Sequence, residues 1–254
     1  MPPFLYVAVA VAWRNIRSSL VRPVVTLIPM IIPLIFFATF AGGFSALAGQ
    51  IDFPGGYTSF QFVFIWLQGN AFQGMFSGFL IARDYESGFA KRFMIAAPSR
   101  GGIVAGYVAS AIVRAVVGGA VLFGVGFIAG LRVTGSIVEL FVLIIVGLMV
   151  AAMCSLWSAG IALRFRTIQA GPLMQMPIFV LIFLSPVFVP LAALQGWIKS
   201  AARVNPFTVF MEQGRNLLSG REPKIALVLA LAAGVLLVGI AWGLRGLRSA
   251  ERAG

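Results

Sequence analysis

Apolar runs of about twenty residues recur along this chain, and short stretches between them carry most of the charge. Because an α-helix rises about 1.5 Å per residue, a run of this length crosses the roughly 30 Å hydrocarbon layer of a bilayer. Hydrophobic residues make up 60% of the 254 residues and charged residues 10%, which is more apolar surface than a soluble core of this size can bury. The sequence therefore predicts an all-α polytopic membrane protein.

The apolar runs predict six spans after an N-terminal helix. Residues 1–22 join an apolar half to Trp13, Arg14 and Arg17, which is typical of a helix lying in the membrane interface. Alternatively, this segment simply begins a long first span. Prolines inside the first and fifth spans predict that these two helices are bent or broken. The predicted spans are 23–44, 60–82, 102–130, 137–163, 171–191 and 225–244.

Six spans place both termini on one side, and the flanking lysines and arginines indicate which side that is. Segments on the side of the termini carry twelve basic residues, and segments on the opposite side carry six. We therefore expect cytoplasmic termini. Five of the six opposing charges lie within 192–224, so a fifth segment that turns back without crossing stays an open alternative.

Polar side chains inside the spans are the candidates for a substrate path. The second span carries amides on two helix faces, with Asn70, Gln73 and Ser77 on one and Gln61 and Gln68 on the other. Because amides in lipid need partners, both faces should meet protein or a polar path. Arg114 lies in the middle of the third span, where it could face the path, pair with Glu139 or be a structural charge. The candidate path residues are Gln68, Asn70, Gln73, Arg114 and Gln175.

Several function classes are excluded by what the chain lacks. Without histidine there is no Ser-His-Asp triad and no imidazole metal ligand, and the single cysteine, Cys154, has no partner. No phosphate-binding loop is present, because none of the three lysines follows a glycine. The basic residues mostly border apolar runs, where they meet lipid headgroups, so we do not expect nucleic acid as a partner. An ion-coupled carrier would need more buried ionisable groups than the spans supply.

The densest charge cluster begins at Arg83, between the second and third spans, and runs through Asp84, Glu86 and Arg92. Phe89 and Phe93 are four residues apart and form an apolar anchor on one helix face, and Pro98 should end that helix. The two carboxylates fall on different helix faces, which argues against a shared catalytic site. A merely solvated loop needs no spaced aromatics, so the cluster favours docking of a soluble partner.

A second motif follows the fifth span. It reads Ser185-Pro186-Val187-Phe188-Val189-Pro190, with Trp197 and Asn205-Pro206-Phe207-Thr208 after it. Asn205 is a good N-cap and Pro206 a good first helical residue, so we expect a helix from about Pro206 to Leu218 that stops at Gly220. Glu212 and Arg215 can pair on its surface.

These two motifs resemble the membrane subunit of type-2 ABC exporters, the group that contains drug-resistance permeases of the daunorubicin type. The resemblance covers nearly the whole chain as one transmembrane domain, 1–254. It implies that residues 83–101 form a cytoplasmic coupling loop for an ATPase, and that 192–224 form an outer re-entrant region. Asp84 and Phe89 depart from the commonest letters of the family. The implied coupling residues are Arg83, Asp84, Glu86, Gly88, Phe89, Arg92 and Phe93, and the implied outer gate comprises Asn205, Pro206, Glu212 and Arg215.

The function that the resemblance implies is transport rather than catalysis. The chain would be the permease of an exporter in the bacterial cytoplasmic membrane, moving a hydrophobic or amphiphilic substrate outwards. ATP and magnesium would bind a separate ATPase subunit, and this chain would bind no cofactor or metal itself. A second permease copy, identical or related, would complete the assembly. Export of a lipid-linked glycan and a non-transporting helical scaffold are the alternatives.

Overall fold

A computed structural model describes residues 2–21, 23–43, 53, 55–90, 92 and 97–252. Within these residues the regular structure is helical and no strand occurs, which confirms the all-α class. The α-helices are α1 (Pro3–Val21), α2 (Pro23–Gly43), α3 (Gly56–Glu86), α5 (Arg100–Ile128), α6 (Ile137–Phe165), α7 (Gly171–Phe183), α8 (Gly196–Val204), α9 (Pro206–Ser219) and α10 (Ile225–Arg252). Short 3-10 turns, η2 (Ile168–Ala170) and η3 (Leu191–Ala193), precede α7 and α8.

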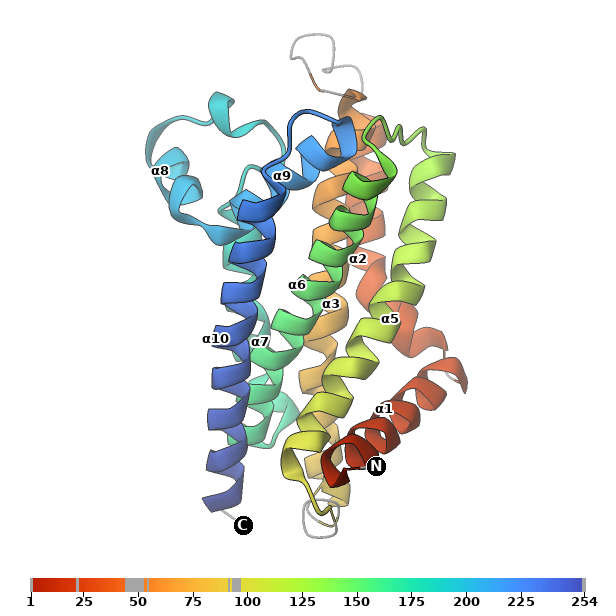
Figure 1. Cartoon of the computed structure of the whole chain (residues 1–254), viewed down its shortest axis with the longest axis vertical. Helices are drawn as coiled ribbons and strands as arrows, with labels where there is room; N and C mark the ends of the chain where they lie inside the picture. The colour runs from red at the N-terminus through yellow and green to blue at the C-terminus, as the bar shows by residue number, and fades with distance from the viewer. Residues whose placement is uncertain are drawn as a thin grey trace.

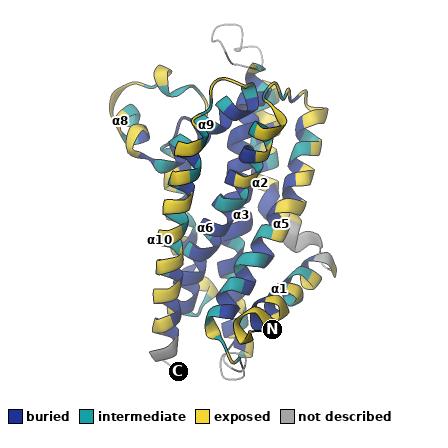
Figure 2. Cartoon of the chain, in the orientation of Figure 1, coloured by how far each residue is buried: buried dark blue, intermediate teal, exposed yellow. Residues whose placement is uncertain are grey.

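Helix α3 is the central element of the bundle. Nearly all its residues from Tyr57 to Ala82 are buried, and it packs against α2, α5, α6, α7 and α9 (Figure 2). The amides at Gln61, Gln68, Asn70 and Gln73 are all buried, which confirms that both polar faces meet protein. This central place explains how a helix with so many polar residues is accommodated, since its neighbours separate it from lipid.

Small residues bring α3 and α6 close together. A Cβ atom added at Gly74 of α3 would lie 2.0 Å from the carbonyl oxygen of Ala151 of α6, so only glycine fits there. Two turns earlier the indole of Trp66 lies against Gly147, and its Nε1 donates to the carbonyl oxygen of Leu143 at 3.0 Å. The alternation of a glycine with a large aromatic gives this interface its tight packing.

Within the described residues three helices, α5, α6 and α10, are long and apolar enough to cross a membrane, and the apolar segments Leu27–Gly43 of α2 and Ile168–Phe183, which includes α7, are shorter. Helix α7 ends at Phe183, although the apolar run continues to about residue 191. Because Pro186 has no amide hydrogen and disfavours a helical conformation at Ser185, the helix cannot continue. At 13 residues α7 is about 20 Å long, which is less than the hydrocarbon thickness.

The bundle has two distinct ends. Helix α1 begins and α10 ends at one end of the bundle, and α3 also ends and α5 begins there (Figure 1). Helices α8 and α9 lie at the opposite end (Figure 1). The second and last spans were predicted to end at 82 and 244, where the apolar runs end. The helices continue to Glu86 and Arg252, because charged side chains at a helix end can still reach water.

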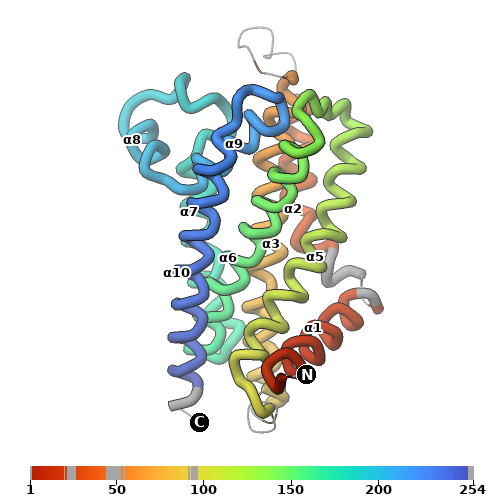
Figure 3. Tube along the Cα trace, viewed as in Figure 1, coloured from red at the N-terminus to blue at the C-terminus, as the bar shows by residue number. Residues whose placement is uncertain are grey.

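Helix α1 lies obliquely across the lower part of α5, as the tube in Figure 3 shows most clearly. Val7 and Val11 are buried against Gly102 and Gly106 of α5, where an added Cβ atom would clash. The outward face carries exposed aromatic side chains such as Trp13. A helix with one face on the bundle and aromatics on the other agrees with the interfacial helix expected for residues 1–22.

Candidate functional site

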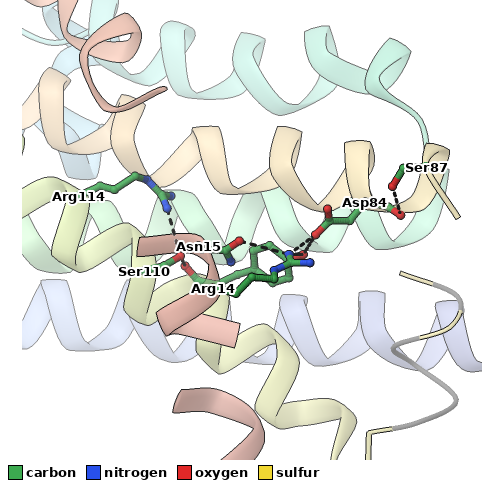
Figure 4. A network of polar contacts seen from close by, with 7 residues as sticks. Arg14, Asn15, Asp84, Ser87, Ser110 and Arg114 are labelled. Carbon is green, nitrogen blue, oxygen red and sulfur yellow. Dashed lines mark hydrogen bonds and ion pairs between the residues drawn. The ribbon is translucent and has the colours of Figure 1, made fainter. Parts of the chain in front are cut away.

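The last turn of α3 is fixed to α1 and α5 by Asp84. The Asp84 carboxylate accepts hydrogen bonds from the guanidinium of Arg14 and from the hydroxyl of Tyr107, both through Oδ2 (Figure 4). Arg14 also donates to Tyr107 Oη at 3.0 Å and to Asn15 Oδ1 at 3.2 Å. Although burial alone lowers it, the pKa of Arg14 is raised by Tyr107 and Asp84, so the guanidinium stays charged.

Two residues on, Glu86 fixes the opposite face of the same turn. Its Oε1 accepts from Thr167 Oγ1 at 2.9 Å and from the amide of Ile168 at 2.8 Å. The prediction that Asp84 and Glu86 lie on different faces is therefore confirmed. One oxygen of each predicted coupling carboxylate therefore accepts hydrogen bonds within the chain, and these bonds position this segment against α1, α5 and the α6–α7 connection.

Other predicted coupling residues face outwards at this end. Arg83 and Arg92 are exposed, and Gly88 has a φ of 74°, a left-handed conformation that favours glycine. Phe89 is 41% exposed, and the Cζ atom of Arg14 lies 4.4 Å from its ring centroid. Phe93 lies outside the described residues, so the expected Phe89–Phe93 pair is untested.

At the other end of the bundle, α9 forms as predicted. Asn205 is the N-cap and accepts from the amide of Phe207 at 2.9 Å, Pro206 is the first helical residue, and Gly220 ends the helix with a φ of 69°. Asn205 Nδ2 also donates to the carbonyl oxygen of Leu181 at 2.6 Å. The cap thus joins the start of α9 to the last turn of α7.

Arg215 connects three segments at this end. It donates to Glu212 Oε1 at 3.0 Å, which confirms the predicted pair, and to the carbonyl oxygens of Val187 at 3.2 Å and Phe60 at 3.4 Å. Its Cζ atom lies 3.4 Å from the Phe60 ring centroid. Burial lowers the pKa of Arg215 to about 10 and Glu212 opposes the shift, so it is protonated at neutral pH. Of the predicted gate residues, Glu212 and Arg215 are therefore in contact with each other, and Arg215 also joins α9 to α3 and to the Ser185–Pro190 loop.

The candidate path residues do not line a single space. On the face of α3 towards α5, Arg114 donates to Ser77 Oγ at 2.8 Å, to Ser110 Oγ at 3.1 Å and to the carbonyl oxygen of Gln73 at 3.5 Å (Figure 4 shows the bond to Ser110). Asn70 donates back to Trp66 within α3. Glu139 instead forms a capping box with Ser136 at the start of α6, so Arg114 has no carboxylate partner in the described part of the chain.

Gln68 and Gln175 lie on the other side of α3, towards α2 and α7. Gln68 follows Phe64, which stacks on Phe36 of α2, and precedes Phe72, which contacts Phe179 of α7. Neither amide atom of Gln68 has a hydrogen-bond partner among the described residues. A groove of about 320 Å³ lies beside Phe72, on this side of α3. It is lined by Ile28, Pro29 and Ile32 of α2, Phe72, Met75, Phe76 and Phe79 of α3, and Gln175 and Phe179 of α7.

Two polar residues of this site were not predicted from the sequence. Tyr107 was part of an apolar span, and Thr167 belonged to the short connection after α6. Their only signal was a hydroxyl near the expected membrane boundary, which is common and unspecific. No group of three His, Cys, Asp or Glu residues that could hold a metal ion occurs within the described ranges.

Residues 6–218 match the ABC-2 type transporter family. The chain belongs to this family. It is also 24% identical over 236 residues to the daunorubicin resistance ABC transporter permease protein DrrB1 of Streptomyces coeruleorubidus, and the match covers 89% of this chain and 80% of that protein. The resemblance read from the two motifs is confirmed. An ABC-2 permease whose described residues include three strongly apolar helices is a multi-pass membrane protein.

Proposed function

We propose that this ABC-2 permease is the membrane-spanning subunit of an exporter that moves a hydrophobic or amphiphilic compound out of a bacterial cell. Two copies, or this chain with a related one, would work with two ATPase subunits that bind ATP and magnesium. Both termini would face the cytoplasm, and α8 and α9 would lie on the outside. The relative that is named for daunorubicin resistance supports this substrate class.

The observation that carries the proposal is the fixing of the last turn of α3 from two sides. Asp84 ties it to Arg14 of α1 and Tyr107 of α5, and Glu86 ties it to Thr167 before α7. A push on the exposed Phe89 would therefore move several helices together rather than bend one loop. Such rigid coupling is what a transporter needs to convert ATPase closure into a change of its transport path.

The groove between α2, α3 and α7 is the best-supported substrate path. Its wall is apolar and aromatic, with the amide of Gln175 at one side, as expected for a site that takes an amphiphile. Buried Gln68 lies one turn along α3 from the groove residue Phe72 and has free hydrogen-bonding capacity within the described structure. On the side of α3 away from the groove, Arg114 would hold α5 to α3 through Ser77 and the carbonyl oxygen of Gln73, while Asn70 donates to Trp66 within α3.

Exposed apolar side chains on α2 and α7 flank this groove, including Ile31, Ile35, Met176 and Val180. A second permease copy placed there would bury these side chains and enclose the groove between two chains. Disulfide crosslinking tests this arrangement. In a Cys154→Ser background, Ile35→Cys should form a dimer on oxidation, and Val116→Cys on the exposed side of α5 should not.

Docking is tested by co-expressing the permease with a candidate ABC ATPase from the same genome. Phe89→Asp and Arg83→Glu should each lower the amount of copurified ATPase at least about tenfold, as for loss of a central interface anchor. Arg203→Glu, a charge reversal on exposed α8, should leave copurification unchanged. Equal recovery of the ATPase with all three variants would show that the docking surface lies elsewhere.

Orientation is tested separately with an impermeant thiol reagent and the same Cys154→Ser background. Ser200→Cys on exposed α8 should be labelled in intact cells, and Ser99→Cys only after the cells are opened. Labelling of position 99 from outside would reverse the topology. A non-transporting scaffold, the second candidate, would tolerate a blocked groove without loss of its cellular role.

A further inference from the structure

A second cavity lies on the side of the bundle away from the α2 groove. It has a volume of about 270 Å³ and lies between α6, α7 and α10, with the start of α9 at one end. Leu181 of α7 and Val238 of α10 line it and are 42% and 70% exposed, so the cavity opens at the surface between these two helices. Because α6 and α10 are long enough to span the membrane, the opening faces lipid.

The cavity wall is apolar almost throughout, which separates it from a site for a polar small molecule. Such sites place several polar groups around an otherwise apolar pocket and usually exceed about 300 Å³. Here one buried polar atom stands out: Nε1 of Trp157 has no hydrogen-bond partner among the described residues. The main lining residues are Met153 and Trp157 of α6, Ile178 of α7, Phe207 of α9, and Val235 and Trp242 of α10.

Two tryptophans, Trp157 and Trp242, form the end of this cavity nearest the C-terminus of α10, and Arg164 lies outside the lining, against Trp242. The rings of Trp157 and Trp242 stack with centroids 5.1 Å apart, and Trp242 Nε1 donates to the carbonyl oxygen of Trp157 at 3.1 Å. The Cζ atom of Arg164 lies 4.3 Å from the Trp242 ring centroid. Since Trp157 and Arg164 are seven residues apart on one face of α6, the indole of Trp242 is held between them.

Arg164 is exposed and forms no ion pair with any carboxylate in the described part of the chain. Arg245 and Arg248 are also exposed on the last turns of α10. This end of the cavity therefore carries positive charge, and no carboxylate among the described residues pairs with Arg164. Arginine held flat on an aromatic ring keeps its outer N–H groups directed to an anion such as phosphate.

We propose that this cavity binds an anionic phospholipid of the cytoplasmic leaflet, with the phosphate at Arg164 and one acyl chain inside. The groups follow one another along the site in the order of the parts of a phospholipid. Arg164 would bind the phosphate, the indole N–H of Trp157 would donate to an ester carbonyl, and the apolar walls would contact the acyl chain. From Arg164 to Met153 is eleven residues of α6, about 16 Å, which is close to half the hydrocarbon thickness. The leaflet assignment rests on the proposed orientation, but the lipid site does not depend on the transported substrate or the ATPase.

Native mass spectrometry of the full-length permease tests the site, after incubation in detergent with phosphatidylglycerol or phosphatidylcholine. Wild type should retain phosphatidylglycerol about tenfold better, the effect of one charge-assisted hydrogen bond. Arg164→Gln should abolish this preference, and Arg203→Gln should keep it, because exposed α8 lies at the opposite end of the bundle. Equal retention of both lipids by wild type would overturn the proposal.

The acyl-chain part of the site is tested by filling the cavity from Gly239, where an added Cβ atom would lie 3.4 Å from the Leu156 side chain and 4.0 Å from the carbonyl oxygen of Met153. Gly239→Leu should lose retained phosphatidylglycerol, whereas Gly234→Leu on the open side of α10 should retain it. Wild-type protein gives an independent readout, because its single cysteine, Cys154, lines the cavity. Alkylation of Cys154 should be slower in phosphatidylglycerol nanodiscs than in phosphatidylcholine nanodiscs, and equal rates would contradict an occupied cavity.

Discussion

The guanidinium of Arg14 lies over the ring of Phe89, with the Cζ atom 4.4 Å from the ring centroid. Arg14 belongs to α1 and Phe89 follows α3, so the contact joins the N-terminal helix to the segment proposed to meet the ATPase. The same guanidinium donates to Asp84, which places one cation between an aromatic ring and a carboxylate. Movement of either element therefore acts on the other through a short chain of direct contacts.

A double-mutant cycle on Arg14 and Asp84 should measure this connection. Arg14→Gln and Asp84→Asn together should reveal a coupling of about 1 kcal/mol, since both side chains are partly exposed and such pairs contribute little more. Thermal unfolding in detergent supplies the four stabilities. Arg17→Gln, an exposed arginine of the same helix, is the control partner, and it should show no coupling to Asp84→Asn. Equal coupling for both arginines would refute a specific pair.

Gly74→Ala should destabilise the bundle by about 1–3 kcal/mol, because the new methyl group would press on the backbone of α6 and force α3 away. Gly124→Ala on α5 is the matched control, since an added Cβ atom there meets nothing within 4 Å. Unfolding midpoints of the two variants in one detergent give the comparison. A Gly74→Ala protein as stable as wild type would show that α3 and α6 pack less tightly than described.

Arg215→Lys should cost about 2 kcal/mol although it preserves the charge. A lysine ammonium cannot reach Glu212 and the carbonyl oxygens of Phe60 and Val187 at once, so buried acceptors lose their donors. The same change at exposed Arg203 should be within about 0.5 kcal/mol of wild type. Chemical denaturation checks both.

The pH dependence of wild type provides a further check on Arg215. Folding lowers the pKa of this cation from 12.5 to about 10, so the unfolded chain binds more protons between these values and stability from this group rises with pH only above about 10. Near neutral pH its protonation should contribute no slope. Loss of stability traced to Arg215 between about pH 6 and 8 would contradict the buried, charged state.

Ile32→Trp should obstruct the groove between α2, α3 and α7 and lower export of an amphiphilic dye by about tenfold, because an indole fills space that the substrate needs. ATPase copurification should be unchanged. Val116→Trp places the same side chain on the exposed face of α5, and its export should match that of wild type. Undiminished export by Ile32→Trp would remove this groove as the path.

Local sequence signals predicted helix ends well where the groups that start or stop the helix lie within one turn of each other. Asn205, Pro206 and Gly220 defined α9 to within a residue, because capping, a fixed φ and a left-handed stop act within one turn. The end of α7 was harder to predict, because the prolines indicated a break while the apolar run continued past Pro186. Hydrophobicity indicates whether a segment can lie in lipid or in a protein core, whereas proline indicates whether the backbone hydrogen bonds of a helix can continue.

The candidate site was predictable as a set of residues but not as a set of contacts. Asp84 and Glu86 read as charges for a soluble partner, whereas both bond within the chain. Gln175, Arg114 and Asn70 read as one path, yet they lie on different sides of α3. Such pairings span from 23 to 93 positions in the sequence, and no local pattern specifies which distant group will lie opposite.

The sequence by itself determined a helical membrane protein, its family motifs and the turn at which most helices begin, since these follow from apolar run length and local hydrogen bonding. Only the tertiary structure decided that α3 is central, that Arg14 meets Asp84 and Phe89, and that Trp242 is held between Trp157 and Arg164. These contacts depend on how far each helix is rotated and how closely glycines such as Gly74 let neighbours approach. Packing of the whole bundle sets both quantities at once.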